Sequence, residues 1–189
     1  MFLLVGLGNP TKKYAENRHN VGFKAILEIQ SRFNFSEFSN KYHGLYSSGT
    51  IDGHKVHLLM PQTYMNKSGH SVAEIVNFFK ISPENIIVFH DELDLEEAKV
   101  KMKTGGSEGG HNGLRSITQC IGTKNYQRIR IGIGHPGDKN QVSDFVLKDI
   151  PKSSQEKFED LYYNLSKVMP VLLEEGQAKA TNDLALLIN

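Results

Sequence analysis

Hydrophobic and polar positions in the first third of the chain alternate between the spacing of strands and the spacing of helices. Residues 2–7 form a continuous apolar run that ends at a glycine, which predicts a buried strand. A polar loop follows, and the apolar residues within 20–33 then recur at helical intervals. Residues 42–50 and 54–60 predict a β-hairpin, because the Asp-Gly pair at 52–53 favours the positive φ angles of a tight turn.

The middle of the chain repeats this alternation. Helices are predicted over residues 68–79 and 114–121. Three further strands are predicted over residues 85–90, 99–103 and 128–133. The last two alternate charged and apolar residues, so each is expected to have one solvated face. The whole pattern predicts an α/β fold of a single domain, residues 1–189, in which a twisted mixed β-sheet carries helices packed on both faces.

The C-terminal segment predicts a long helix with an interruption. Ser153 and Ser154 can cap its start, and the apolar residues that follow recur at intervals of three and four. Pro170 lies inside this pattern, where it lacks an N–H donor and its ring crowds the preceding turn. We therefore expect the helix to be kinked or split at that position.

Composition and charge narrow the function classes only a little. The chain has 189 residues, 39% of them hydrophobic, and a formal net charge of +1, so overall charge points to no polyanionic partner. The single cysteine, Cys120, excludes an intrachain disulfide and suits a reducing cytoplasm; its helical surroundings favour a buried thiol. No stretch approaches the roughly 20 apolar residues of a membrane span, so we expect a soluble cytoplasmic protein without membrane contact.

The first loop, GLGNPT, begins like the glycine-rich turn of a dinucleotide-binding protein. The third glycine is missing, however, and helical spacing resumes only after His19, so no helix N-terminus meets a pyrophosphate. A nucleotide cofactor is therefore disfavoured. A polar loop at the carboxyl end of a strand is still a common place for a ligand, which makes Asn9 and His19 candidate site residues.

Asp91 is the expected partner of His19, because it ends a predicted buried strand. A carboxylate there can bond one imidazole nitrogen and leave the other free to take a proton from water. His90 is the alternative base, although its side chain and that of Asp91 should point to opposite faces of the strand. The sequence shows no nucleophile elbow, because its one GxSxG string, GGSEG at residues 105–109, lies in a loop and the next predicted helix begins only at residue 114. It also has no closely spaced set of metal ligands, since His54 and His57 should lie on opposite faces. Hydrolysis by a histidine-activated water is the simplest remaining chemistry, with no metal and no cofactor.

A basic segment lies between residues 99 and 130, with seven basic side chains against one acidic, a local charge of +6. An ordinary solvated sheet edge would also explain it. The intervening GGSEGG loop, however, exposes backbone N–H groups beside the basic residues, a combination suited to the phosphates of a nucleic acid. The basic residues are Lys99, Lys101, Lys103, Arg115, Lys124, Arg128 and Arg130, and the acidic one is Glu108.

Seven motifs in one order carry a resemblance to a known family: GLGNP, Tyr14, RHNVG, PQTYMNKSG, HDELDL, GGHNGLRS and RIRIGIGHPG. The chain resembles the bacterial-type peptidyl-tRNA hydrolases from the first strand to the C-terminal helix. That family hydrolyses the ester between peptide and tRNA in peptidyl-tRNA released prematurely from ribosomes. The resemblance implies a cytoplasmic and usually monomeric enzyme, with tRNA as its partner and without metal or cofactor.

The resemblance also implies roles for individual residues. His19 matches the base that activates water, and Asp91 matches the carboxylate that orients it. Lys103 and Arg130 match residues that hold a phosphate of the tRNA acceptor end. The positions implied to bind the substrate are Asn9, Tyr14, Tyr64, Asn66, His111 and Asn112. An RNA-binding protein that has lost hydrolysis and a nucleotide-dependent oxidoreductase remain the alternative functions at this point.

Overall fold

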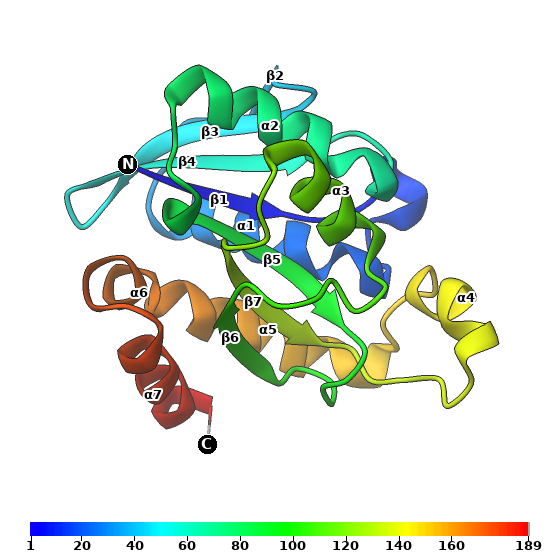
Figure 1. The fold of residues 1–189 in the computed structure, drawn as a ribbon. Coiled ribbons are helices and arrows are strands. Elements are labelled where there is room, and N and C mark those ends of the chain that lie inside the picture. Colours follow the sequence, from blue (N-terminus) through cyan, green and yellow to red (C-terminus); the bar gives the residue numbers. More distant parts are fainter. Residues whose placement is uncertain (189) are drawn as a thin grey trace.

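A seven-stranded β-sheet, in the order β2-β3-β4-β1-β5-β7-β6, forms the centre of the computed structural model, which describes residues 1–188 (Figure 1). The four inner strands, β4-β1-β5-β7, are parallel, whereas the pairs β2-β3, β3-β4 and β6-β7 are antiparallel. The predicted mixed sheet is thus confirmed. The strands are β1 (Phe2–Gly6), β2 (Ser39–Lys41), β3 (Gly44–Ile51), β4 (His54–Pro61), β5 (Ile86–Glu92), β6 (Val100–Thr104) and β7 (Gln127–Gly132).

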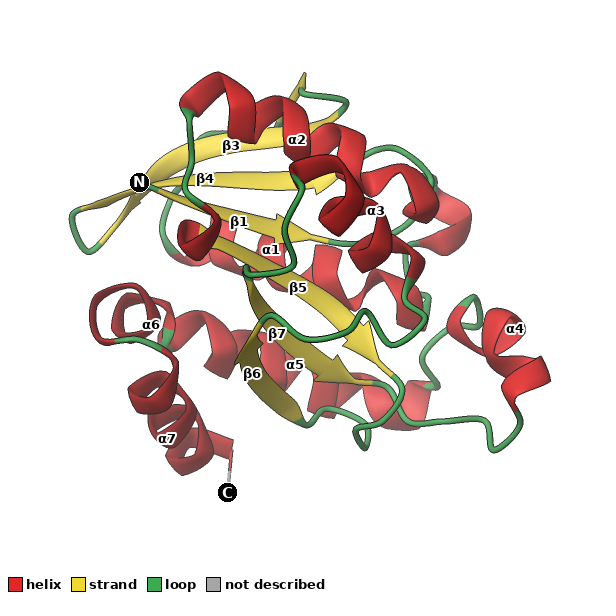
Figure 2. Ribbon diagram, viewed as in Figure 1, coloured by secondary structure: helices red, strands yellow, loops and turns green. Residues whose placement is uncertain are grey.

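Helices cover both faces of the sheet, as the sequence predicts (Figure 2). One apolar cluster joins Leu4 of β1 to α1 and α5, and another joins Leu3 to α2 and α3. Adjacent residues of β1 thus face opposite sides, which is why a continuous apolar strand can support two layers of helices. The helices are α1 (Val21–Arg32), α2 (Ser68–Phe79), α3 (Asn112–Ile121), α4 (Val142–Val146), α5 (Lys152–Lys167), α6 (Met169–Glu175) and α7 (Gln177–Ile188).

The glycine-rich first loop serves close packing. A Cβ atom added at Gly6 would collide with the backbone carbonyl of Gly22 on α1, and one added at Gly22 would collide with that of Phe89 on β5. The two glycines therefore let α1 lie directly against the ends of β1 and β5. The β3–β4 turn is also as predicted, because Asp52 and Gly53 both have positive φ, at 48° and 83°.

The C-terminal helices confirm one expectation and correct another. Pro170 does split the predicted helix, since α5 ends at Lys167 and α6 starts at Met169 with the proline in its first turn. The predicted serine cap is wrong, because α5 begins at Lys152 after Pro151 and has no side-chain cap. The Ser154 hydroxyl instead donates a hydrogen bond to Glu97, at 2.8 Å.

Three short or terminal elements, β2, α4 and α7, have no counterpart in the sequence prediction. β2 is a three-residue exposed strand and α4 has five residues, so neither is long enough to show a periodic pattern. Cys120 also differs from expectation, because its side chain is partly exposed. Within residues 1–188, no helix has the length and apolar character that crossing a bilayer requires.

Candidate active site

Asp91 lies near the carboxyl end of β5, and its carboxylate joins two histidines from different segments. One oxygen is 2.7 Å from Nδ1 of His19, and the other is 2.7 Å from Nε2 of His111. The Asp91 side chain is buried, with 3% of its surface exposed, against 13% for His19. The expected contact between His19 and Asp91 is therefore present, and the strand places the carboxylate beneath the more accessible ring.

His111 is the member of this cluster that sequence reasoning did not connect to Asp91. It caps the N-terminus of α3, where its Nδ1 accepts hydrogen bonds from the backbone N–H groups of Gly113 and Leu114, at 3.1 and 3.3 Å. Because Nδ1 is an acceptor, the proton resides on Nε2 and is donated to Asp91. Its position just before a predicted helix was the available signal.

His19 comes from the short 3-10 helix η2 (Arg18–Asn20), which follows β1 and precedes α1. A 3-10 helix has about three residues per turn, so three successive side chains point in three directions. The Arg18 guanidinium lies 4.1 Å from the ring centre of Phe145 on α4 and donates a hydrogen bond to the backbone carbonyl of Asp149, at 3.2 Å. The turn that carries His19 is thereby fixed against α4 and the segment that follows it.

Asn20, the third residue of this turn, holds the first loop. Its Oδ1 accepts a hydrogen bond from the backbone N–H of Asn9 at 2.9 Å, and its Nδ2 donates to the carbonyl of Asn9 at 3.0 Å. The Asn9 Oδ1 in turn accepts from the backbone N–H of Met65, at 2.9 Å. These bonds occupy the amide oxygen of Asn9, so its amide N–H groups are the ones that can serve a ligand. Asn20 is a second residue that sequence reasoning missed, although the RHN motif contains it.

The charges in this cluster favour an ionised Asp91 and a basic His19. Burial lowers the pKa of the His19 imidazole, but the charge of Asp91 and the hydrogen bond to it outweigh burial and raise that pKa above 6.5. Burial opposes ionisation of Asp91 too, yet the electrostatic interactions and hydrogen bonds with the two imidazoles hold its pKa well below the usual range. A pair of this kind keeps Nδ1 of His19 protonated and leaves Nε2 to exchange a proton.

His90, the alternative base, has the opposite environment. Its side chain is 2% exposed, and burial, together with the charge of His111, lowers its pKa to about 3. Its Nδ1 lies 2.8 Å from the backbone carbonyl of Asp91 and not against the carboxylate. The ring is therefore neutral and donates to that carbonyl, which disfavours His90 as the base.

His19, Asp91 and His111 also lie close enough together to count as a possible metal-binding group. Their potential ligand atoms fall within 4.8 Å of one another, a proximity that the sequence motifs did not predict. The two nitrogen–oxygen separations of 2.7 Å are those of charge-assisted hydrogen bonds, and the acceptor role of His111 Nδ1 requires a proton on Nε2. We therefore interpret the cluster as hydrogen-bonded.

Several of the predicted substrate residues are exposed or partly exposed. Asn66 and Tyr64 come from the segment of η3 (Met65–Lys67), and Tyr64 is 62% exposed. Asn112 is the exposed first residue of α3, and a Cβ added at Gly113 would approach the Met65 sulfur to 2.6 Å. The close packing of η3 on α3 thus brings two of the predicted substrate residues to neighbouring segments. Tyr14 is partly exposed in η1 (Lys12–Tyr14).

Comparison with known proteins decides the family. A sequence profile described as peptidyl-tRNA hydrolase matches residues 3–187. The chain belongs to the peptidyl-tRNA hydrolase family. Proteins named peptidyl-tRNA hydrolase from Ruegeria sp. (strain TM1040) and Parvibaculum lavamentivorans are each 48% identical to it, over 100% of this chain and over 75% and 92% of their own lengths. A crystal structure of peptidyl-tRNA hydrolase from Acinetobacter baumannii is 42% identical, with a TM-score of 0.91 over 97% of this chain and 94% of that one.

Membership makes the chain a peptidyl-tRNA hydrolase, an enzyme connected with translation, and its substrate class includes tRNA. In this peptidyl-tRNA hydrolase, the two predicted phosphate-binding residues, Lys103 and Arg130, lie on the neighbouring strands β6 and β7. Both side chains are partly exposed, and Nε of Arg130 lies 2.8 Å from a Glu92 oxygen. Partial burial, followed by the charges of Arg130 and Arg128, lowers the pKa of Lys103. The basic groups are thus near one another beside the glycine-rich loop.

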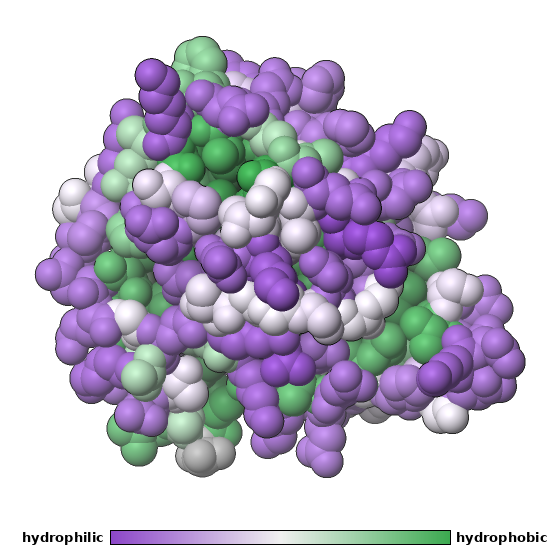
Figure 3. Space-filling model, in the orientation of Figure 1, coloured by the Kyte–Doolittle hydropathy of each residue, from purple (hydrophilic) through white to green (hydrophobic). Residues whose placement is uncertain are grey.

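Arg128 corrects the prediction of a wholly solvated basic face. Its side chain is fully buried, and its guanidinium donates to the backbone carbonyls of Ser107 at 2.7 Å, Gly106 at 3.0 Å and Lys124 at 3.3 Å. The alternation in β7 places Arg128 and Arg130 on one face, but the loop folds over Arg128. Figure 3 shows this loop as a near-white band across the middle of the face, between hydrophilic side chains.

Proposed function

We propose that this enzyme hydrolyses the ester bond between peptide and tRNA in peptidyl-tRNA released prematurely from ribosomes, with a water activated by His19 and without a covalent intermediate. The observation that carries the proposal is the 2.7 Å hydrogen bond from Nδ1 of His19 to Asp91, which leaves Nε2 as the basic nitrogen. Among residues 1–188, no serine, threonine or cysteine side chain is hydrogen-bonded to the His19 ring. Water is therefore the proposed nucleophile.

In the proposed reaction, the water oxygen bonds to the ester carbonyl carbon while Nε2 of His19 takes one of the water protons. The tetrahedral intermediate then collapses, the bond to the ribose oxygen breaks, and the proton held by His19 passes to that oxygen. The products are tRNA with a free hydroxyl and the peptide carboxylic acid, which ionises to the carboxylate and releases the second water proton to solvent. Asp91 stays ionised throughout, because its pKa is held well below the usual range, and its negative charge stabilises the imidazolium that forms beside it.

Amide side chains are proposed to position the ester. Asn9 can offer its amide N–H groups because its oxygen is bound to Met65. Asn66 and Asn112 are exposed and can donate to or accept from a peptide backbone without adding charge near the developing oxyanion. The remaining proposed substrate contacts are made by Tyr14, Tyr64 and His111. The two tyrosines offer partly apolar surfaces, and His111 lies next to Asn112 in the chain.

Lys103 and Arg130 are proposed to hold a phosphate of the acceptor end, because the two cationic groups lie close together on adjacent strands. We further propose that the enzyme works in the cytoplasm as a monomer, with one partly exposed cysteine suited to a reducing compartment. Sedimentation of the purified protein tests the oligomeric state.

The deciding experiment measures release of tRNA from purified peptidyl-tRNA. General base catalysis typically contributes about a hundredfold to ten-thousandfold, so His19→Ala should reduce kcat by at least about a hundredfold while tRNA binding persists. Unchanged turnover in that variant would refute the activated water, and failure of the unmodified enzyme to release tRNA would refute the function itself.

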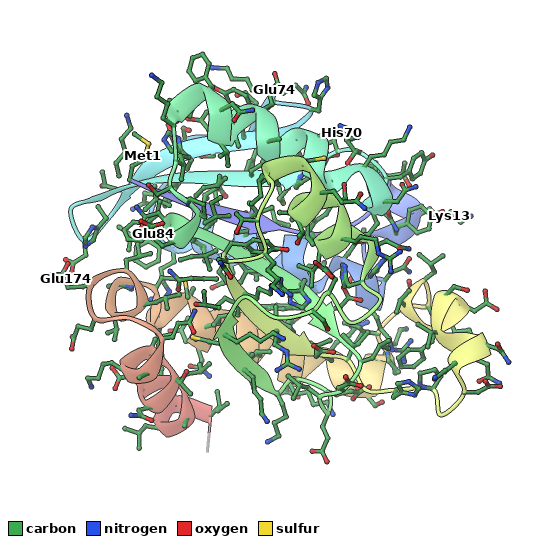
Figure 4. The ribbon with its side chains drawn as sticks, in the orientation of Figure 1. Met1, Lys13, His70, Glu74, Glu84 and Glu174 are labelled. Carbon is green, nitrogen blue, oxygen red and sulfur yellow. The ribbon has the colours of Figure 1, made fainter. Side chains whose placement is uncertain are left out.

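His54→Ala is the matched control, because His54 also binds a carboxylate, with Nε2 2.6 Å from Glu174. Glu174 lies at the edge of the molecule opposite Lys13, which comes from the loop after β1 (Figure 4). Loss of a histidine–carboxylate pair at that distant edge should leave kcat unchanged. A loss of kcat equal to that of His19→Ala would show that the assay reports general damage to the fold.

A further inference from the structure

A cavity of about 280 Å³ lies between α1 and α5. These two helices cover the face of the sheet opposite α2 and α3 (Figure 1). Its apolar wall consists of Leu27, Ile150, Phe158 and the ring of Tyr162. Its size is close to the lower end of the range of small-ligand sites, and a mainly apolar wall with a few polar groups is typical of them. None of the residues proposed above for ester hydrolysis lines it.

The charged groups around the cavity are mostly acidic. Glu16, Glu28 and Glu159 line it together with a single basic residue, Lys24, so three carboxylates against one ammonium give a net charge of −2. Lys24 is 2.7 Å from Glu16. Within residues 1–188, neither Glu28 nor Glu159 forms an ion pair. In a chain of net charge +1, this local balance favours a cationic ligand.

Two buried oxygen atoms beside the cavity lack hydrogen-bond partners among the described residues. They are the hydroxyl of Tyr162, a residue 7% exposed, and Oδ1 of Asn17, a residue 4% exposed. Tyr162, Glu16 and Glu159 line the same cavity. Burial, followed by the charges of the two carboxylates, raises the pKa of Tyr162, so its hydroxyl stays protonated. Buried polar atoms are normally bonded, and both of these can accept from an N–H donor.

We propose that this cavity binds an alkylammonium ligand of the class of short aliphatic diamines. One ammonium group would donate to the Tyr162 oxygen and to a neighbouring carboxylate, and the hydrocarbon chain would pack on Leu27 and Phe158. The second ammonium group would pair with a further carboxylate at the rim. Lys24 on Glu16 is an intramolecular example of the same pairing. An inorganic cation would gain nothing from the apolar wall, and an anion would be repelled.

The cavity adjoins the turn that carries His19. Asn17 directly precedes η2, and its Nδ2 donates to Asp149 at 2.6 Å. An ammonium group has three N–H donors, so one N–H of the bound ligand would also be free to donate to Asn17 Oδ1. That bond would hold the oxygen of this amide, whose nitrogen is already bound to Asp149. The ligand would thereby brace the start of the turn from the face opposite α2 and α3, without touching the substrate.

Calorimetric titration of the free enzyme, without tRNA, tests the site. 1,4-Diaminobutane is the probe, and 1,4-butanediol, of equal chain length but uncharged, is the control. We expect saturable binding of the diamine at one site and none of the diol, with amide NMR shifts confined to residues 16–28 and 150–162. Absence of diamine binding, equal binding of the diol, or shifts centred elsewhere would overturn the proposal.

Variants locate the interaction. Glu159→Gln and Tyr162→Phe should each raise Kd about threefold to fivefold, because each removes one partner of a partly exposed ammonium group. Lys24→Met should lower Kd by a similar factor, since it removes the competing ammonium. Tyr162→Phe keeps the ring and deletes a hydroxyl that has no partner in residues 1–188, so the fold should persist, as a thermal unfolding scan will show.

The matched control is Glu156→Gln, an exposed carboxylate on the same helix but outside the cavity, which should leave Kd unchanged. Unaltered Kd in both Glu159→Gln and Tyr162→Phe, or a loss in Glu156→Gln as large as theirs, would overturn the site. Because the readout is binding of a diamine to the free protein, its result is independent of the test of ester hydrolysis.

Discussion

At the scale of single residues, Asp91 determines how His19 behaves. Both carboxylate oxygens are occupied, one by each imidazole, so the carboxylate cannot rotate without losing a bond to one ring. The geometry fixes which nitrogen of His19 is protonated, and the negative charge raises the pKa of that ring despite its burial. Position and basicity of the proposed base thus have the same cause.

The pH dependence of the reaction follows from that raised pKa. A general base works only when deprotonated, so kcat/KM should fall as pH decreases through a midpoint above 6.5, the ordinary value for histidine. Asp91→Asn removes the charge and should move this midpoint to lower pH, with a plateau reduced about a hundredfold. Profiles of kcat/KM against pH for both proteins provide the measurement. An unshifted midpoint in the variant would contradict the proposed origin of the basicity.

At the scale of elements, the sequence predicts those parts of the site that local spacing determines. His19 and Asp91 each follow or end a strand with a clear apolar pattern, so their approach at the carboxyl edge could be expected. The bond between His111 and Asp91 could not, because it depends on how a glycine-rich loop without periodicity places the start of α3. The predicted solvent exposure of Arg128 was wrong for the same reason. Alternation along β7 predicts the face on which this side chain lies but not the loop that covers it.

Arg128 makes that loop part of the fold. Replacing it with lysine leaves one ammonium group where a guanidinium meets three backbone carbonyls. We expect Arg128→Lys to lower the free energy of unfolding by about 2 to 4 kcal/mol, and to increase hydrogen exchange at residues 105–110. Urea unfolding and exchange measurements test this. The control is Arg115→Lys, an exposed arginine on α3, and equal losses in the two variants would argue against the anchoring role.

At the scale of the whole molecule, chain topology creates the site. The connection after β1 leads to α1 on one face of the sheet, while the connection after the adjacent β4 leads to α2 on the other. Neighbouring parallel strands whose connections diverge in this way leave a crevice at their carboxyl ends. The alternation of strands and helices was enough to predict this architecture, whereas the short elements β2 and α4 have too few residues to be seen in the sequence.

Charge distribution is also a property of the whole molecule. The net charge is only +1, so attraction to tRNA should depend on the local basic group. Lys103→Ala or Arg130→Ala should raise KM more than it lowers kcat, and should reduce the slope of log KM against log salt concentration by about one. Lys55→Ala, an exposed lysine on the other half of the sheet, is the control. A fall in kcat with constant KM would speak against phosphate binding.

The three successive side chains of η2 have a consequence for how this protein can evolve. Each makes a hydrogen bond to a different segment: Arg18 to the segment after α4, His19 to Asp91, and Asn20 to the first loop. Because successive residues of a 3-10 turn point about a third of a turn apart, inserting or deleting one residue here would redirect all three at once. A substitution alters one of these interactions and leaves the other two in place, whereas a change of length disrupts all three in a single step. This turn should therefore tolerate no insertion or deletion, while the exposed β3–β4 turn can vary in length.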